Sequence, residues 1–384
     1  MAVYKIFPTK DSTMYSLYPS MNTGLDEIIE VSSTTVGVLD YSVDPQVSRF
    51  LIQFSSDEIT DVIDNKISTS PSFKTYFRAF NAKISGLNLT SSLEIYPISG
   101  RWGMSTGRYI PDPTSEVKKY NGTSWTWRNY SGSSKWQTTG TYGNLATASF
   151  TGSNPGGGNW YTGSGTSFEV KQSQSFAYSN PLDIKSDVTD TIHTWYSGTL
   201  PNDGFIIKQA DSQEFIFNSA LNAEFKFFSI DTHTIYPPQL EFRWYDYDFN
   251  TGSSTNTIIS ISELYIASPN NTGVFYSESI QRFRLNIRPK YPTRVFQTSS
   301  VYTTNYYLPE SQSLYAIKDL DTNEFVIDFD SDYTRISADA TSSYFDIYMN
   351  GLEPERYYTV LVKTVVDNNT LVINDNINFK VSNG

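Results

Sequence analysis

The 384-residue chain contains no cysteine. This absence excludes disulfide bonds, thiolate metal sites and a cysteine nucleophile. Histidine is scarce as well: only His193 and His233 are present, with no His-x-x-x-His spacing. Two isolated histidines do not supply the clustered ligands that a zinc site requires. We therefore expect no metal at these residues.

The sequence also lacks long apolar runs and clusters of basic residues. No apolar stretch approaches the length of about 18 residues that a transmembrane helix needs, so we expect no membrane insertion. Residues 1–8 have neither the apolar stretch nor the small-residue site of a signal peptide. The formal net charge is −12, from 40 acidic and 28 basic residues. Binding to nucleic-acid phosphates requires clustered Lys and Arg, so we expect no nucleic-acid partner.

Sequence motifs of catalysis are missing too. No Gly-x-Ser-x-Gly motif places a nucleophile at a strand-to-helix turn. The run Gly156-Gly157-Gly158 is not followed by the Lys-Ser/Thr pair of a phosphate-binding loop. We predict that the protein is not an enzyme, has no catalytic residues and carries no cofactor.

One segment has the spacing of a calcium-binding loop. Asp319, Asp321 and Asn323 alternate as such ligands do, but Glu324 stands where the loop requires glycine. The following residues alternate like a strand. We predict a tight hairpin turn here and no metal.

Aromatic residues are abundant: 28 Tyr, 24 Phe and 7 Trp. Each large ring can bury roughly 150–250 Å² of surface, so a few dozen of them can offset the conformational entropy lost on folding. Two-residue alternation of apolar and polar side chains is common, and Gly, Pro, Asn and Ser interrupt it. The clearest predicted strands are residues 48–54, 92–96, 222–228, 239–244, 282–287 and 324–329. This pattern predicts an all-β fold built of sandwiches.

One short helix is predicted within residues 186–195. Val188, Ile192 and Trp195 recur at helical spacing, Ser186 or Asp187 can cap the N-terminus, and Gly198 lies where the helix would end. We expect Trp195 to anchor this helix to the core. In the predicted strand 239–244, Trp244 shares a face with Leu240 and Phe242, which makes it a second core residue.

The chain is long enough for two domains. Residues 250–256 are polar without apolar partners, and we place the boundary there. Within residues 257–384, Leu352, Pro354, Tyr358 and Val360 form a Leu-x-Pro-x-x-x-Tyr-x-Val arrangement. The leucine would pack inward, the proline would fix a bend, and the tyrosine hydroxyl would bond to nearby backbone as a tyrosine corner. This segment resembles a fibronectin type III or immunoglobulin-like domain.

Residues 1–250 resemble the DNRLRE-type jelly-roll module, which pairs a "DVT…W…G" turn with a "GF-(I/L)-(I/L)-K" strand. The segments that carry this likeness are residues 48–54, 93–96, 187–189, Trp195, Gly198, 202–208 and 237–242. The resemblance implies a jelly-roll-like sandwich and no particular activity. A long aromatic insertion at about 103–170 departs from the family.

The aromatic insertion supplies the candidate binding residues. Tryptophan and tyrosine rings can anchor protein interfaces, stack on sugars, or simply fill space beneath long loops. These three interpretations stay open from the sequence alone. The candidates are Trp125, Trp127, Tyr130, Trp136, Trp160 and Tyr161.

Two further stretches, residues 228–238 and 344–352, resemble virion structural proteins of contractile-tailed phages. The resemblance implies a structural protein of the tail, baseplate or neck, assembled in the host cytoplasm and located in the virion. Its partners would be other virion proteins and copies of itself. The alternative is a module that binds a glycan or receptor on the host surface.

Overall fold

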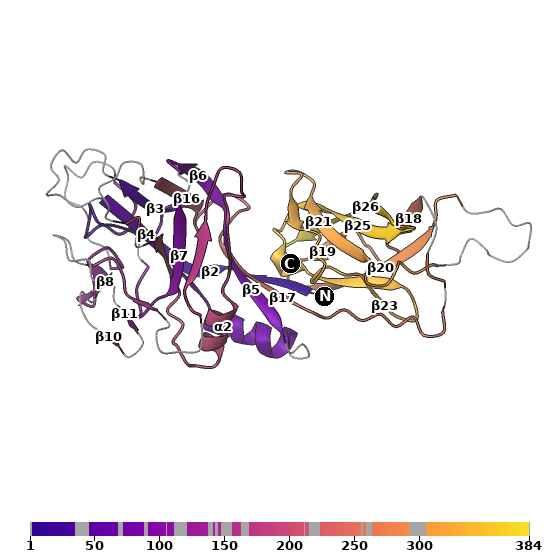
Figure 1. Cartoon of the computed structure of the whole chain (residues 1–384), viewed down its shortest axis with the longest axis horizontal. Helices are drawn as coiled ribbons and strands as arrows, with labels where there is room; N and C mark the ends of the chain where they lie inside the picture. The colour runs from indigo at the N-terminus through magenta and orange to yellow at the C-terminus, as the bar shows by residue number, and fades with distance from the viewer. Residues whose placement is uncertain are drawn as a thin grey trace, which may run out of the picture. The chain divides into compact units, whose positions relative to one another are not determined.

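A computed structural model shows a protein built almost entirely of β-strands (Figure 1). The predicted all-β fold is therefore confirmed. The structure describes residues 2–34, 46–67, 72–87, 91–104, 106–110, 121–136, 141–142, 145–146, 156–162, 169–210, 212–214, 223–254, 256–258, 263–291 and 305–383.

The chain divides into two compact units. The N-terminal unit comprises Ile6–Lys66 and Lys74–Glu241, and the C-terminal unit comprises Met1–Lys5, Ile67–Phe73 and Phe242–Gly384. The polar segment 250–256, which we predicted to be the boundary, thus falls inside the C-terminal unit. Thr255 itself lies outside the described residues.

Two sheets face one another in the N-terminal half. The larger has eight strands in the order β13-β7-β15-β4-β3-β16-β6, with β2 also paired to β4, and the smaller has the order β1-β17-β5-β14. The strands are β1 (Ala2–Ile6), β2 (Pro8–Tyr15), β3 (Ile28–Thr34), β4 (Gln46–Phe54), β5 (Phe73–Ala79), β6 (Asn81–Ser85), β7 (Ser92–Pro97), β13 (Gln172–Ser175), β14 (Ile184–Asp187), β15 (Phe205–Gln209), β16 (Ala223–Phe228) and β17 (Gln239–Trp244).

Phenylalanine rings fill the space between these sheets. The Phe77 ring on β5 lies 6.2 Å from that of Phe54 on β4 and 5.8 Å from that of Phe205 on β15. The chain crosses from one sheet to the other between consecutive strands, from β5 to β6, from β13 to β14 and from β16 to β17. This gives a sandwich of the jelly-roll-like kind.

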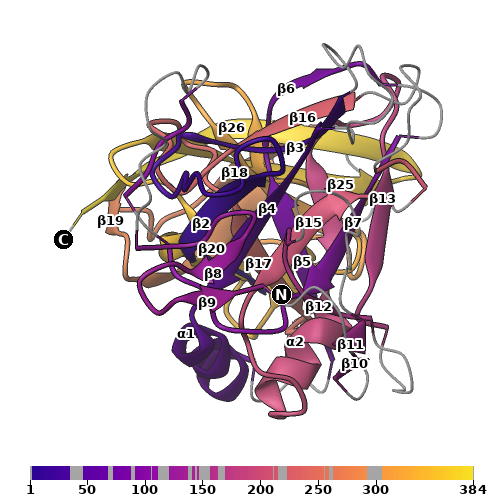
Figure 2. The same ribbon diagram turned by 90° about the vertical axis from the view of Figure 1, so that its left-hand side faces the viewer.

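Helices cover one end of the N-terminal unit (Figure 2). They are α1 (Ser56–Asp61), the π-helical turn η1 (Val62–Lys66) and α2 (Thr189–Tyr196). Trp195 on α2 is buried, with its ring 4.7 Å from Phe205, and so anchors the helix to the sheet.

The prediction for this region was partly wrong. Helix α2 starts at Thr189, because Ser186 and Asp187 belong to β14, which pairs with β5. Asp187 nevertheless accepts a hydrogen bond from the Thr189 backbone N–H at 3.0 Å. Gly198 adopts φ +72° just after the helix, as a C-terminal cap requires. Helix α1 was not predicted, although its cap is visible in the sequence: the Ser55 side chain accepts a hydrogen bond from the Glu58 N–H.

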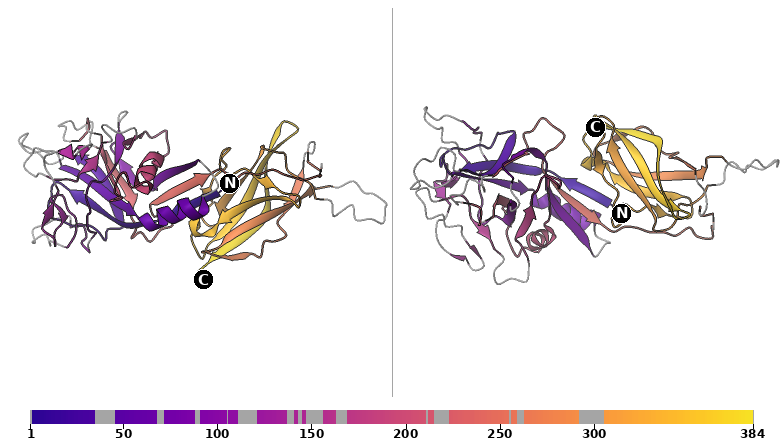
Figure 3. Two further views of the ribbon diagram at one scale, coloured as in Figure 1. Left: turned by 90° about the horizontal axis from the view of Figure 1, so that it is seen from below. Right: turned by 45° about the horizontal axis from the view of Figure 1, so that its top comes forward.

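The C-terminal unit has the topology of an immunoglobulin-like sandwich (Figures 1 and 3). Its sheets have the orders β18-β20-β24-β23 and β19-β26-β25-β21-β22, and β19 pairs with β26 in parallel. The strands are β18 (Leu264–Ala267), β19 (Val274–Tyr276), β20 (Ile280–Pro289), β21 (Ser313–Asp319), β22 (Phe325–Ile327), β23 (Ser337–Ala338), β24 (Ser343–Tyr348), β25 (Tyr357–Val366) and β26 (Asn369–Ser382), with a 3₁₀ turn η4 (Met349–Gly351).

Stacked aromatic rings form the core of this sandwich. The Phe345 ring on β24 lies 4.3 Å from Tyr315 on β21 and 5.4 Å from Phe283 on β20, both in stacked geometry. The Phe345–Tyr315 pair thus bridges the two sheets, whereas Phe345 and Phe283 lie on neighbouring strands of one sheet. Trp244 is also buried, with its ring 5.5 Å from that of Tyr348.

The expected tyrosine corner is present. The Tyr358 hydroxyl donates to the Glu353 carbonyl at 2.8 Å, and the Tyr358 side chain is buried. Leu352 is buried as well, whereas Pro354 is only half-buried at the bend. The corner ties the start of β25 to the segment that leads into it.

Candidate functional site

The aromatic insertion packs against the outer face of the eight-stranded sheet. Leu51 on β4 and Ile206 on β15 point to this face, and both are fully buried. The cluster that covers it, called here the aromatic layer, comprises Met14, Val47, Leu51, Tyr96, Ile98, Trp102, Trp125, Trp136, Trp160 and Ile206. The central strands are therefore buried on both faces.

The six candidate binding residues fall into two groups. Trp125, Trp136 and Trp160 are buried in the aromatic layer, with exposed fractions of 0%, 3% and 5%. Their ring faces contact protein, so for these three the structure corresponds to the packing interpretation. Trp127, Tyr130 and Tyr161 are half-exposed and keep part of their surface available to a ligand.

Short strands hold these rings in place. Trp127 lies on β8 (Trp127–Asn129), which pairs with β9 (Ser134–Lys135), and its ring meets that of Tyr130 edge-on at 5.2 Å. Trp160 and Tyr161 form β12 (Trp160–Tyr161), which pairs with β11 (Leu145–Ala146), itself paired with β10 (Thr141–Tyr142). The Trp136 indole N–H donates to the Ser124 carbonyl at 2.9 Å.

Beneath the aromatic layer lies a buried network of charges. Arg49 on β4 donates to both carboxylate oxygens of Glu214, at 3.0 and 2.8 Å. The Lys208 ammonium lies 3.3 Å from Glu214 and 3.5 Å from Glu94. All four side chains are buried, and the more exposed Lys171 also pairs with Glu94 at 2.7 Å, so both buried carboxylates have cationic partners.

The triple-glycine run closes over this network. The Gly157 carbonyl accepts a hydrogen bond from Arg49 at 2.6 Å, and Gly157 has φ +81°. A Cβ atom on Gly157 would come within 2.7 Å of the Trp125 ring and 2.9 Å of Arg49 Nη1. Only glycine fits both this backbone conformation and this space.

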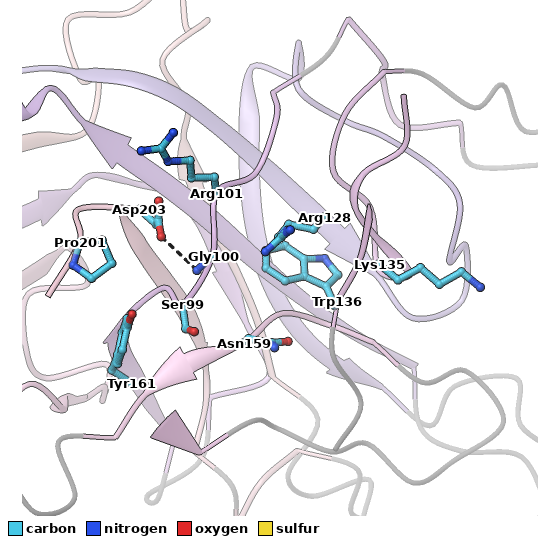
Figure 4. A pocket seen from close by; sticks show the side chains of 10 residues that line it. All are labelled: Ser99, Gly100, Arg101, Arg128, Lys135, Trp136, Asn159, Tyr161, Pro201 and Asp203. Atoms are coloured by element: carbon cyan, nitrogen blue, oxygen red, sulfur yellow. Dashed lines mark hydrogen bonds between the residues drawn. The ribbon is translucent and has the colours of Figure 1, made fainter. Parts of the chain in front are cut away.

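A pocket of about 380 Å³ opens beside the aromatic layer (Figure 4). Residues 99–101 after β7, the β8–β9 hairpin, β12 and the loop 201–203 before β15 all line it. Its aromatic walls are Trp136 and Tyr161, and its charged groups are Arg101, Arg128, Lys135 and Asp203. Tyr161 thus lines a cavity, which the sequence did not reveal.

Positive charge dominates this pocket. Arg101, Arg128 and Lys135 form no ion pair with any residue that the structure describes. Asp203 is the one acid among the lining residues. Burial raises the pKa of its carboxyl group, while the hydrogen bond from the Gly100 N–H at 3.0 Å and the nearby Arg101 charge oppose that shift. The sequence signal that could have indicated this site is the presence of basic residues, Arg128 and Lys135, within the aromatic insertion of an otherwise acidic chain.

Other candidate groups have structural roles. Asp319 accepts hydrogen bonds from the Asp321 and Thr322 N–H groups and pairs with Arg356 at 2.6 Å, while Asn323 has φ +64°. This is the predicted hairpin turn between β21 and β22. His193 and His233 are exposed. Within the described parts of the chain, no three His, Asp or Glu side chains gather closely enough to hold a metal ion, and no helix is long and apolar enough to cross a membrane.

Comparison with known proteins adds little. No family model matches the chain, and no curated protein is similar to it. A DUF4785-family protein of Legionella pneumophila is similar at 9% identity, over 100% of this chain and 62% of its own length. The chain thus spans less than two thirds of that protein. With a TM-score of 0.17, this likeness carries no argument about fold or function.

Proposed function

We propose that this protein is a structural component of a tailed-phage virion, in the tail, baseplate or neck, and acts through protein–protein interfaces. The observation that carries this proposal is an exposed apolar patch at one edge of the immunoglobulin-like sandwich. We call the patch, formed by Val274, Tyr276, Ile280 and Tyr357, the β19 patch.

The geometry of the β19 patch suits an interface. Val274 and Tyr276 alternate with the buried Phe275, so both point outward, with 53% and 63% of their surface exposed. Val274 pairs with Lys380 on β26, which in turn pairs with Tyr357 on β25, so that the patch extends across three strands. Lys380 thus lies between Val274 and Tyr357, and the exposed apolar side chains flank it. Exposed apolar side chains grouped in this way mark interaction sites, and aromatic side chains dominate the binding energy of such sites.

Strand β19 is also an edge strand among the strands that the structure describes, where it pairs with β26 alone. An open strand edge beside exposed apolar side chains can dock against another chain. Repeated copies around a symmetry axis would let modest interfaces add up to stable assembly. The assignment to a phage particle depends on the resemblance of residues 228–238 and 344–352 to virion proteins.

The test is to locate the chain in purified particles by electron cryo-microscopy and mass spectrometry. We expect symmetric copies with the β19 patch buried against a neighbour. The double variant Val274→Asp, Tyr276→Asp should lose incorporation, whereas Tyr178→Asp, at an equally exposed tyrosine of the N-terminal unit, should retain it. Absence of the chain from particles would overturn the proposal.

A second candidate function is glycan binding, as in attachment to a host surface. The pocket beside Tyr161 specifically favours it, because it combines an aromatic ring with charged groups in a cavity large enough for a small ligand.

A further inference from the structure

We infer that the pocket lined by Arg128, Tyr161 and Asp203 binds a sugar that carries a carboxylate, such as a uronic or sialic acid. This inference rests on the second candidate function and names its ligand class. It is independent of assembly through the β19 patch, which lies in the other unit.

Arg128 is the anchor of the site. Its guanidinium packs over the bare backbone of Gly100: a Cβ atom on Gly100 would lie 2.7 Å from Arg128 Nη1 and 3.3 Å from Cδ. Gly100 has φ +125°, a conformation that favours glycine and keeps this approach open. The Nε–H of Arg128 is buried and has no hydrogen-bond partner among the described residues. The side chain is therefore held in position, and its Nε–H donor is unused by the residues that the structure describes.

The ligand should be an anion because positive charge surrounds the pocket. Arg101 and Lys135 are exposed and extend outward on either side of Arg128 in Figure 4. Such a cluster attracts negative ligands to a chain whose net charge is −12. A guanidinium also matches the geometry of a carboxylate, to which it can donate two parallel hydrogen bonds.

The remaining walls fit the other parts of a sugar. Tyr161 is half-exposed and lines the pocket together with Ser99, so its ring can serve as a stacking surface. The Asp203 carboxyl group can accept hydrogen bonds from sugar hydroxyls. Its charge also disfavours a doubly charged phosphate relative to a singly charged carboxylate. The volume of about 380 Å³ lies within the range of small-ligand pockets.

Isothermal titration calorimetry of the full chain tests this inference. The probes are glucuronate, galacturonate and N-acetylneuraminate, with glucose as the neutral comparison and glucose 6-phosphate as the phosphate comparison. We expect at least one carboxylated sugar to bind at least about tenfold more tightly than glucose or glucose 6-phosphate. Its affinity should fall as salt rises, because screening weakens charge attraction.

Variants identify the residues involved. Arg128→Gln should weaken binding at least about tenfold, and Arg128→Lys should also weaken it, because lysine keeps the charge but loses the planar fork. Tyr161→Ala should weaken binding by a similar factor. Arg288→Gln is the matched control, because Arg288 lies 4.7 Å from the Tyr265 ring in the C-terminal unit. This variant should bind the sugar as tightly as the wild type does. Circular dichroism and thermal melting of each variant distinguish lost binding from lost folding.

Several outcomes would overturn the inference. They are no saturable binding of any carboxylated sugar up to about 20 mM, equal affinity for glucose, tighter binding of glucose 6-phosphate, or unchanged binding by folded Arg128→Gln. None of these results would bear on incorporation into particles, so the assembly proposal is tested separately.

Discussion

Asp11 on β2 has a buried carboxyl group that accepts one hydrogen bond from the residues that the structure describes. Its Oδ2 accepts from the Ile230 N–H at 2.8 Å, whereas Oδ1 has no partner among the described residues. Burial raises the pKa of Asp11 from 3.8 to about 7, and the nearby Asp231 and Asp26 charges add to the rise. The folded protein therefore holds a proton on Asp11 at pH values where the unfolded chain has released it.

This proton makes stability depend on pH in a defined direction. Between about pH 4 and 7 the folded state binds more protons at Asp11 than the unfolded state, so the free energy of unfolding falls as pH rises. Burial also raises the pKa of Asp26, to about 6, which acts in the same sense. We expect a lower urea midpoint at pH 8 than at pH 5. Asp11→Asn should flatten this dependence and stabilise the protein at pH 8 by on the order of 2 kcal/mol. A midpoint that rises from pH 5 to pH 8 would contradict the expectation.

At Gly157 a single added methyl group should be strongly destabilising. Gly157→Ala combines a positive φ with a clash against Trp125 and Arg49, and we expect a loss of about 2–4 kcal/mol in unfolding free energy. Gly198→Ala is the matched control, because Gly198 has φ +72° with no atom near its Cβ position. It should cost only about 1 kcal/mol. Equal losses in urea denaturation would show that Gly157 is not packed as described.

At the level of single elements, the contribution of the tyrosine corner before β25 to stability can be measured by comparing the same substitution at two adjacent tyrosines. Tyr358→Phe removes the hydrogen bond to the Glu353 carbonyl and should cost about 1–1.5 kcal/mol. Tyr357→Phe changes the neighbouring ring, which is 53% exposed, and should be within about 0.5 kcal/mol of wild type. Chemical denaturation of both variants measures the difference. If Tyr358→Phe left the free energy of unfolding unchanged, the hydrogen bond of the tyrosine corner would add no stability.

The strands were predictable because alternation is a local property of the chain. The predicted strand 239–244 coincides with β17, and 92–96 differs from β7 by one residue. The segment 324–329 was too long, since β22 ends at Ile327. Its last residues alternate in the sequence but have no partner strand among those described.

The aromatic layer was not predictable in the same way. Nothing local distinguishes a tryptophan that covers a sheet from one that faces solvent, because the difference depends on a surface formed by distant strands. Trp125 and Trp127 are two residues apart, yet one is fully buried and the other half-exposed. The pocket has the same origin. Arg101, Arg128 and Asp203 come together only after the segment following β7, the β8–β9 hairpin and the loop before β15 have folded beside one another.

For the molecule as a whole, net charge and exposed apolar surface have opposite effects on self-association. Each copy carries a net charge of −12, so copies repel one another, while the β19 patch favours contact. We expect raising the salt from about 0.05 to 0.5 M to increase self-association, since screening shortens the range of repulsion. Analytical ultracentrifugation checks this. Val274→Asp, Tyr276→Asp should remain monomeric at both salt concentrations, and the proposal would be weakened if it associated like wild type.

The position of Val3 in the core of the C-terminal unit affects how this unit folds during synthesis. Val3 belongs to the hydrophobic core of the C-terminal unit, and the Lys5 carbonyl accepts a hydrogen bond from Asn350 at 3.1 Å. A ribosome adds about 5–20 residues per second, so the first strand emerges roughly 20–80 s before the last. During that interval Val3 has no native core to enter. The immunoglobulin-like unit therefore completes its fold only after β26 has emerged from the ribosome, and until then the residues of β1 that belong to this unit remain accessible to chaperones and proteases.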